Sequence, residues 1–83
     1  MVNKQILNFQ VVYTQEPEGG FTVTVPKLPG CVTYGKDLTE AKNMAIDAIK
    51  LYLKSLKKHH EPIPYKDDFF IGSIDLTFPV SNA

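Results

Sequence analysis

Arginine and tryptophan are absent from this chain of 83 residues, and cysteine occurs once. Because every basic residue is lysine and the formal net charge is zero, the composition argues against nucleic acid as the main partner, which proteins usually contact through arginine and a basic excess. No run approaches the roughly 18 apolar residues that cross a bilayer, and Met1–Gln5 lacks the apolar stretch of a secretory signal. Since Cys31 alone forms no disulfide within the chain, we expect a cytoplasmic protein.

The length permits one domain, which we place over residues 1–83. A chain this short buries only about 60–65% of the surface that its unfolded form exposes. Its core must therefore come from few elements, and a second copy of the chain would help to close it.

Alternating apolar and polar residues predict strands in the first part of the chain. In Ile6–Thr14 one face carries Leu7, Phe9, Val11 and Tyr13. Phe21–Val25 alternates in the same way, and the intervening Gln15–Gly20 contains proline and two glycines, so we expect an antiparallel hairpin. Pro26–Gly30 ends this hairpin, because proline cannot donate to a sheet, and Cys31–Tyr34 is expected to form a short third strand.

The segment Asp37-Leu38-Thr39-Glu40 has the form of a helix capping box, in which Asp37 accepts from the Glu40 amide and Glu40 reaches back to the Asp37 amide. Helical periodicity continues to about Lys58, with polar residues opposite one apolar stripe. That stripe consists of Leu38, Ala41, Ala45, Ala48, Ile49, Tyr52, Leu53 and Leu56.

A last strand is expected at residues 69–78, where Phe70, Ile74, Leu76 and Phe78 share one face. The order β-β-β-α-β predicts an α+β fold, a two-layer α/β sandwich with one long helix packed on a mainly antiparallel sheet. The helix is expected to lead to a last strand parallel to the first, through a right-handed crossover. Because an unpaired edge invites pairing with another chain, we expect a homodimer or a dimer-based tetramer. Its edge strand would use Phe69, Ile71, Ser73, Asp75 and Thr77.

The run from Tyr13 to Ala41 resembles the N-terminal domain of HicB-like antitoxins. The shared features are a hairpin ending in glycine, a proline, the segment Leu28-Pro29-Gly30-Cys31, a threonine, a glycine, and a helix that opens with Glu-Ala. The likeness spans about Ile6 to Pro64. The Leu-Pro-Gly-Cys segment between strand and helix is fairly specific, whereas any one of its dipeptides is weak.

The resemblance implies a partial ribonuclease-H-like fold and an antitoxin that neutralises HicA, a small toxin with a double-stranded-RNA-binding fold that cleaves messenger RNA. It also implies dimers or tetramers. Many members of the family carry a further C-terminal helix-turn-helix or ribbon-helix-helix domain that binds operator DNA. This chain continues after Phe78 only from Pro79 to Ala83, which argues against direct DNA binding.

Candidate catalytic groups do not converge in the sequence. Ribonuclease-H chemistry needs carboxylates that hold divalent metal, and Ile6–Thr14 contains no acidic residue, while Asp37 is explained by the cap. His59 and His60 are adjacent, so on a helix they point about 100° apart and do not chelate as an i, i+4 pair would. Cys31 has no histidine near it in sequence and is more typical of a small buried hydrophobe. We expect no enzyme, no metal and no cofactor.

Three features indicate partner binding. Met44 and Leu51 flank the polar side of the helix, where they form an interface or are covered by other parts of the chain. The lysines along the helix track phosphates, meet an acidic protein surface or keep the helix soluble. The prolines of Pro26–Gly30 stiffen that loop in advance of binding. The candidate partner-binding residues are Met44, Leu51, Lys50, Lys54, Lys57, Leu28 and Pro29.

We therefore expect an antitoxin that masks the active surface of an RNA-cleaving toxin. The alternative is a nucleic-acid-binding module that uses the lysine stripe, and a third hypothesis, a residual metal-dependent nuclease, has the least support in the sequence.

Overall fold

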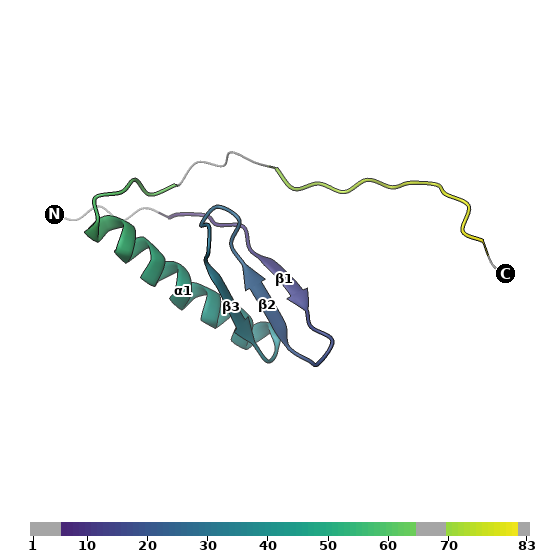
Figure 1. Ribbon diagram of the computed structural model, residues 1–83, viewed down its shortest axis with the longest axis horizontal. Helices are drawn as coiled ribbons and strands as arrows, with labels where there is room; N and C mark the ends of the chain where they lie inside the picture. The colour runs from purple at the N-terminus through teal and green to yellow at the C-terminus, as the bar shows by residue number, and fades with distance from the viewer. Residues whose placement is uncertain (1–5, 65–69, 82–83) are drawn as a thin grey trace.

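Three antiparallel strands are followed by one long helix (Figure 1). The computed structural model describes residues 6–64 and 70–81. The strands β1 (Val12–Gln15), β2 (Phe21–Thr24) and β3 (Val32–Gly35) lie side by side in the order of the chain, and the helix α1 (Leu38–Lys58) covers one face of the sheet. This arrangement confirms the predicted α+β class.

The predicted hairpin joins β1 to β2, with Gln15 opposite Phe21. Its loop is closed by two backbone hydrogen bonds of 3.0 Å, from the Glu16 amide to the Gly20 carbonyl and from the Gly19 amide to the Glu16 carbonyl. Gly20 has a φ of +82°, which glycine adopts without strain. A Cβ atom at this position would collide with the ring of Tyr34, whose hydroxyl donates to the Gly19 carbonyl at 2.9 Å. The glycine pair therefore serves both the turn and its contact with β3.

The first strand is shorter than the predicted Ile6–Thr14, because β2, the strand with which it pairs, ends at Thr24. Val12 lies opposite Thr24, so residues before Val12 would have to pair beyond the end of β2. There the chain turns inward, with the Leu28 amide donating to the Val25 carbonyl at 2.9 Å. The third strand is shifted by one residue from the prediction and ends at Gly35.

The capping box is confirmed in part. Asp37 Oδ1 accepts from the Glu40 amide at 2.8 Å, but Glu40 Oε1 accepts from the Lys36 amide at 2.8 Å rather than from Asp37. At the other end His60 adopts a φ of +57°, and the Glu61 amide donates to the Leu56 carbonyl at 2.8 Å. This is a Schellman closure, which satisfies carbonyls that the last turn leaves unpaired.

The core lies where the middle of α1 meets β2 and the loop after it. One buried cluster joins Val23 to Ala41 and Ala45, and small alanines let the helix approach the sheet closely. The apolar stripe of the helix is confirmed for these residues, but Leu38 is exposed, because it precedes the point at which Ala41 meets the sheet. A second cluster consists of Val25, Leu28 and Cys31, with Phe9, Val11, Ala48, Ile49, Tyr52 and Leu53 packed against it.

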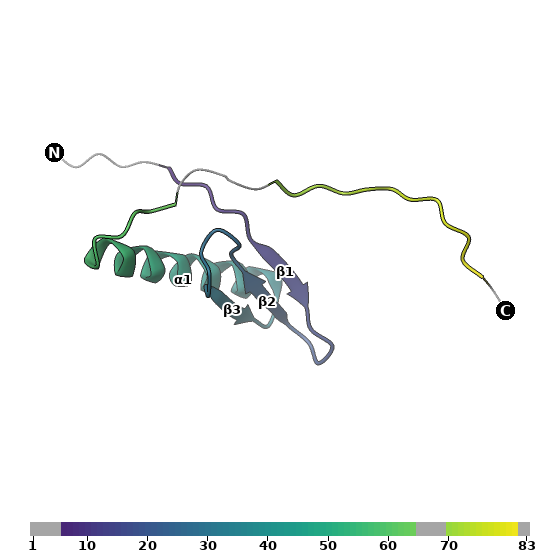
Figure 2. The ribbon, with the colours of Figure 1, turned by 45° about the horizontal axis from the view of Figure 1, so that its top comes forward.

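The strand expected at residues 69–78 is not formed over the part that the structure describes, residues 70–78. Phe69 lies outside the described residues. The segment from Phe70 to Ser81 extends away from the sheet and helix in both views (Figures 1 and 2), so none of the described strands β1, β2 and β3 lies beside it. A strand needs a partner for its peptide groups, and the β-β-β-α-β prediction is therefore wrong for the described residues of a single chain.

Candidate protein-interaction surface

One flank of α1, on the side of β3, carries exposed apolar side chains. Met44, Ala48, Leu51 and Ser55 follow one another at spacings of four, three and four residues, which places them on one line along a helix. The side chains of Met44 and Leu51 are 44% and 70% exposed. Neither is therefore covered by the described part of the chain, which was the alternative that the sequence left open.

Strand β3 borders this apolar flank through Val32, which is exposed. Tyr34 is exposed as well, but it lies opposite Thr22 on the sheet face away from the helix, where its hydroxyl donates to the Gly19 carbonyl. Between β3 and the helix lies a shallow hollow of about 270 Å³. Its lining consists of Gly30, Cys31, Val32, Ala48, Leu51, Tyr52 and Ser55. We call the exposed residues Val32, Met44 and Leu51 the β3 flank, because exposed apolar side chains that gather on one surface mark protein interfaces.

The loop between β2 and β3 is fixed beside this flank. The hydroxyl of Tyr52 donates to the Pro29 carbonyl at 2.8 Å, and Gly30 takes a φ of +83°. Pro29 is exposed, as expected for a partner-binding residue, but the side chain of Leu28 is only 1% exposed. Leu28 is therefore a core residue, because the Leu28 amide turns back onto Val25 and carries the side chain inward.

The lysines Lys50, Lys54 and Lys57 are exposed, as predicted. They do not lie on the same line as Met44 and Leu51, because consecutive helical residues are separated by about 100°. Lys50 instead borders the opposite, β1 side of the helix. The structure thus divides the predicted partner-binding set into two surfaces, one apolar and one basic.

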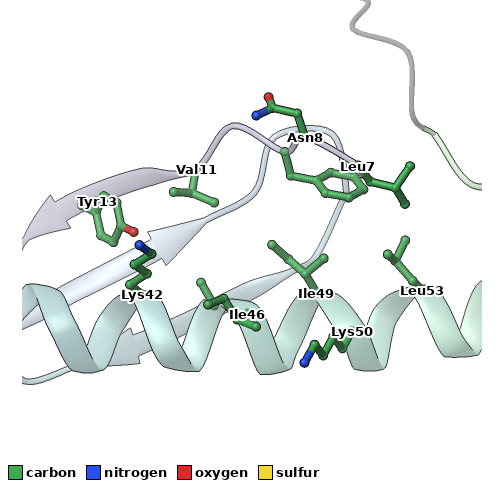
Figure 3. Close-up of a pocket in the computed structure, with 11 residues that line it drawn as sticks. Leu7, Asn8, Val11, Tyr13, Lys42, Ile46, Ile49, Lys50 and Leu53 are labelled. Carbon is green, nitrogen blue, oxygen red and sulfur yellow. The ribbon is translucent and has the colours of Figure 1, made fainter. Parts of the chain in front are cut away.

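The β1 side of the helix borders a larger groove of about 550 Å³ (Figure 3). The sequence predicted one wall of it, since Leu7, Val11 and Tyr13 point towards the helix as the alternation required. On the opposite wall Ile49 and Leu53 belong to the predicted apolar stripe of the helix, but sequence reasoning missed Ile46, which is exposed beside them. An isoleucine outside the predicted stripe was the signal that could have identified it.

Reactive side chains in the described residues do not gather into a site. Within residues 6–64 and 70–81, no group of three or more His, Cys, Asp or Glu side chains is placed to hold a metal ion. His59 Nδ1 lies 2.8 Å from the Ser55 carbonyl, and His60 occupies the left-handed turn that closes the helix. Burial raises the pKa of the Cys31 thiol, which opposes formation of the reactive thiolate. The features that the described residues offer to a partner are therefore the β3 flank and the groove beside β1.

No helix in the described ranges has the length and apolar character needed to cross a membrane.

Comparison with known proteins agrees with this geometry. Curated relatives include UPF0150 proteins from Thermoplasma acidophilum, 45% identical over 70% of this chain and 84% of the relative, and from Synechocystis, 39% identical over 88% and 91%. A third, from Archaeoglobus fulgidus, is 39% identical over 80% of this chain and 87% of its own length. Residues 9–70 match the family described as the HicB_like antitoxin of bacterial toxin-antitoxin systems. This match covers most of the chain, including all three strands and the helix, and the protein belongs to the HicB-like antitoxin family.

Proposed function

We propose that this protein is an antitoxin that binds a small RNA-cleaving toxin of the HicA kind and neutralises it by covering the toxin's active surface. The family supplies the class of partner, and the observation that carries the proposal is the exposed β3 flank. Neutralisation by masking needs a tight interface of roughly 1,200–2,000 Å² in total and no catalytic group. The protein acts as a stoichiometric inhibitor and not as an enzyme.

The β3 flank suits this role because it is apolar and held rigidly. Leu51 projects from the middle of a helix of 21 residues, and Val32 projects from a strand that is paired along its length with β2. Side chains on such elements lose little conformational freedom on binding. The exposed Pro29 stands beside them on a loop that the Tyr52 hydrogen bond holds in place.

The proposal predicts a gene for a small basic toxin beside the gene of this protein, and the test combines the two products. We expect the two to copurify as a stoichiometric complex in which cleavage of messenger RNA stops. Leu51→Asp places a charge in the middle of the β3 flank and is expected to weaken binding by at least about tenfold, or about 1.4 kcal/mol. Since Leu51 is 70% exposed, the substitution leaves the fold intact.

Asn43→Asp is the matched control, because it adds the same charge at an exposed position of α1 outside the flank. It is expected to leave binding unchanged. RNA cleavage that continues in the presence of excess wild-type protein would overturn the proposal. If Leu51→Asp and Asn43→Asp weaken toxin binding equally, the β3 flank is not the binding surface.

The exposed lysines support a second candidate, a nucleic-acid-binding module. Lys50, Lys54 and Lys57 are exposed along about two turns of α1, and such a row contacts phosphates in a salt-dependent manner. Replacing all three by glutamine is expected to abolish binding to RNA at low salt if this function exists. Absence of binding by the wild-type protein at low salt rejects it.

A further inference from the structure

Two parts of this chain expose apolar surface that is complementary in form. The first is the groove between β1 and α1, which we call the β1 groove. The second is the segment of residues 70–78, which we call the C-terminal segment. The proposed toxin contact uses neither of them. The β3 flank lies across the helix from the β1 groove, and it includes no residue of the C-terminal segment.

The β1 groove lies at an open edge of the sheet. In the order β1-β2-β3, β1 pairs with β2 on one side only, and among the described residues no strand lies on its other side. Beyond β1 the groove is walled by apolar side chains from both layers, including Leu7 and Val11 from the strand side and Ile46, Ile49 and Leu53 from the helix (Figure 3). A fourth strand at this edge would bond to β1 and cover those side chains.

The C-terminal segment has the pattern of such a strand. Its even-numbered positions are mainly apolar, and Phe70 and Ile74 are 94% and 90% exposed. The odd-numbered positions Ser73, Asp75 and Thr77 are polar, and Ile71 is the one apolar residue of that set. In an extended strand these two sets face opposite sides of the sheet, so the segment would place one face on the helix and the other in water.

The dimensions of groove and segment agree. The groove follows α1 from Lys42 to Leu53, about 17 Å at 1.5 Å per residue. An extended strand covers that length with about five or six residues at 3.3 Å each. The C-terminal segment is long enough to line the whole groove.

We infer that the C-terminal segment of a second copy of this chain adds to the free edge of β1 and fills the β1 groove, and that the exchange is reciprocal. A second copy is favoured over the chain's own segment because the segment runs away from its own sheet in both views (Figures 1 and 2). Each copy then gains the fourth strand that its sequence pattern predicts. The dimer keeps both β3 flanks free for a partner.

The buried area is sufficient for a stable dimer. A fully covered phenylalanine buries about 150–250 Å², and each segment can place Phe78 over the groove together with Ile74 and Leu76, which are all exposed in the single chain. The two Phe78 rings of an exchanged pair therefore supply roughly 300–500 Å². Ile74, Leu76 and the walls of the groove raise the total into the range of about 1,200 Å² or more that specific interfaces bury.

The first experiment measures the mass of the full chain by light scattering at micromolar concentration. The wild type is expected to have twice the mass of the 9.3 kDa chain. Ile74→Asp in the segment and Ile46→Asp in the groove are each expected to give the single-chain mass. Both side chains are exposed in the single chain, so neither change disturbs the core, and circular dichroism should show unchanged helix content.

Two matched controls separate this interface from others. Ile71→Asp adds the same charge to the opposite face of the segment, and Leu51→Asp adds it to the opposite flank of the helix; both are expected to remain dimeric. Because Leu51→Asp is also the variant that should weaken toxin binding, loss of the dimer and loss of the toxin contact are distinguishable. A wild type that is monomeric, or a dimer that survives Ile74→Asp, overturns the inference.

Isotope-filtered NMR on a mixture of labelled and unlabelled wild-type protein provides a second measurement that needs no variant. Contacts between the Ile46 methyl groups of a labelled copy and the Phe78 ring of an unlabelled copy are expected. If these contacts occur only within one chain, the segment folds back onto its own groove and the exchange is excluded.

Discussion

The hydroxyl of Tyr52, in the middle of α1, donates a hydrogen bond of 2.8 Å to the carbonyl oxygen of Pro29. The two residues are separated by 23 positions in the chain, and the bond joins the helix to the loop that carries the Leu-Pro-Gly-Cys segment. It explains why a loop with two prolines and a glycine has one conformation beside the β3 flank. The helix that presents Leu51 to a partner also holds the loop that presents Pro29.

Tyr52→Phe removes this hydrogen bond and keeps the ring. A hydrogen bond of this kind contributes about 1 kcal/mol, so we expect the free energy of unfolding in urea to fall by about that amount. Tyr13→Phe, which removes a hydroxyl from an exposed tyrosine of β1, is the comparison and should change stability less. Equal losses in the two variants would show that the Pro29 contact contributes no stability.

Gly35 ends β3 at the point where the chain enters α1. A Cβ atom there would collide with the backbone nitrogen and Cα of Ala41, and backbone atoms cannot move aside as a flexible side chain can. Gly35→Ala is therefore expected to separate the helix from the sheet and to unfold the protein at 37 °C or lower its melting temperature by well over 10 °C, since about 4–8 °C corresponds to 1 kcal/mol in a domain of this size. The neighbouring Lys36→Ala, at an exposed position, should stay within about 0.5 kcal/mol of the wild type. Thermal unfolding followed by circular dichroism compares the two.

Local signals predicted the elements whose partners are close in sequence. The hairpin was predicted because turn residues separate two alternating segments, and the start of α1 was predicted because Asp37 caps it. The one-residue shift of the Glu40 bond from Asp37 to Lys36 depends on the angle at which the chain enters the helix, which residue types do not determine.

The errors concern contacts made over longer distances. Leu28 was predicted to bind a partner because the prolines of Pro26–Gly30 stiffen its loop in advance of binding, yet its side chain is buried. Alternation in residues 70–78 indicated a strand, but the pattern contains no information on which chain supplies the partner. The β1 groove was missed for the same reason, since it is formed by Ile46 and by residues more than thirty positions earlier, such as Tyr13.

Cys31 gives a prediction for pH dependence. Burial raises the pKa of its thiol above the ordinary value of 9.0, because the thiolate is less well solvated in the folded state. The folded protein thus holds the thiol proton more tightly than the unfolded chain does. This contribution to stability is complete below pH 9 and is lost as the pH rises through the folded-state pKa. Unfolding in urea at several pH values should show a steeper loss above pH 9 for the wild type than for Cys31→Ala.

The same burial predicts slow labelling of Cys31 by thiol reagents in the native protein at pH 8, and rapid labelling in urea. The rate in urea serves as the reference for a fully accessible thiol. Native labelling at the rate measured in urea would contradict the burial of Cys31 and the pH dependence together.

Leu28 and Pro29 are neighbours with opposite expected effects. The side chain of Leu28 is 1% exposed, and truncation of a buried leucine costs about 2–5 kcal/mol, so Leu28→Ala should lower the melting temperature by at least about 8 °C. Pro29 is exposed and uses only its carbonyl to bind Tyr52, which alanine retains, so Pro29→Ala should change stability by about 1 kcal/mol or less. In the toxin-binding assay Pro29→Ala is expected to weaken binding more than Leu28→Ala does, because Pro29 lies at the surface beside the β3 flank. A Leu28→Ala variant of normal stability that binds the toxin poorly would move Leu28 from the core back to the interface.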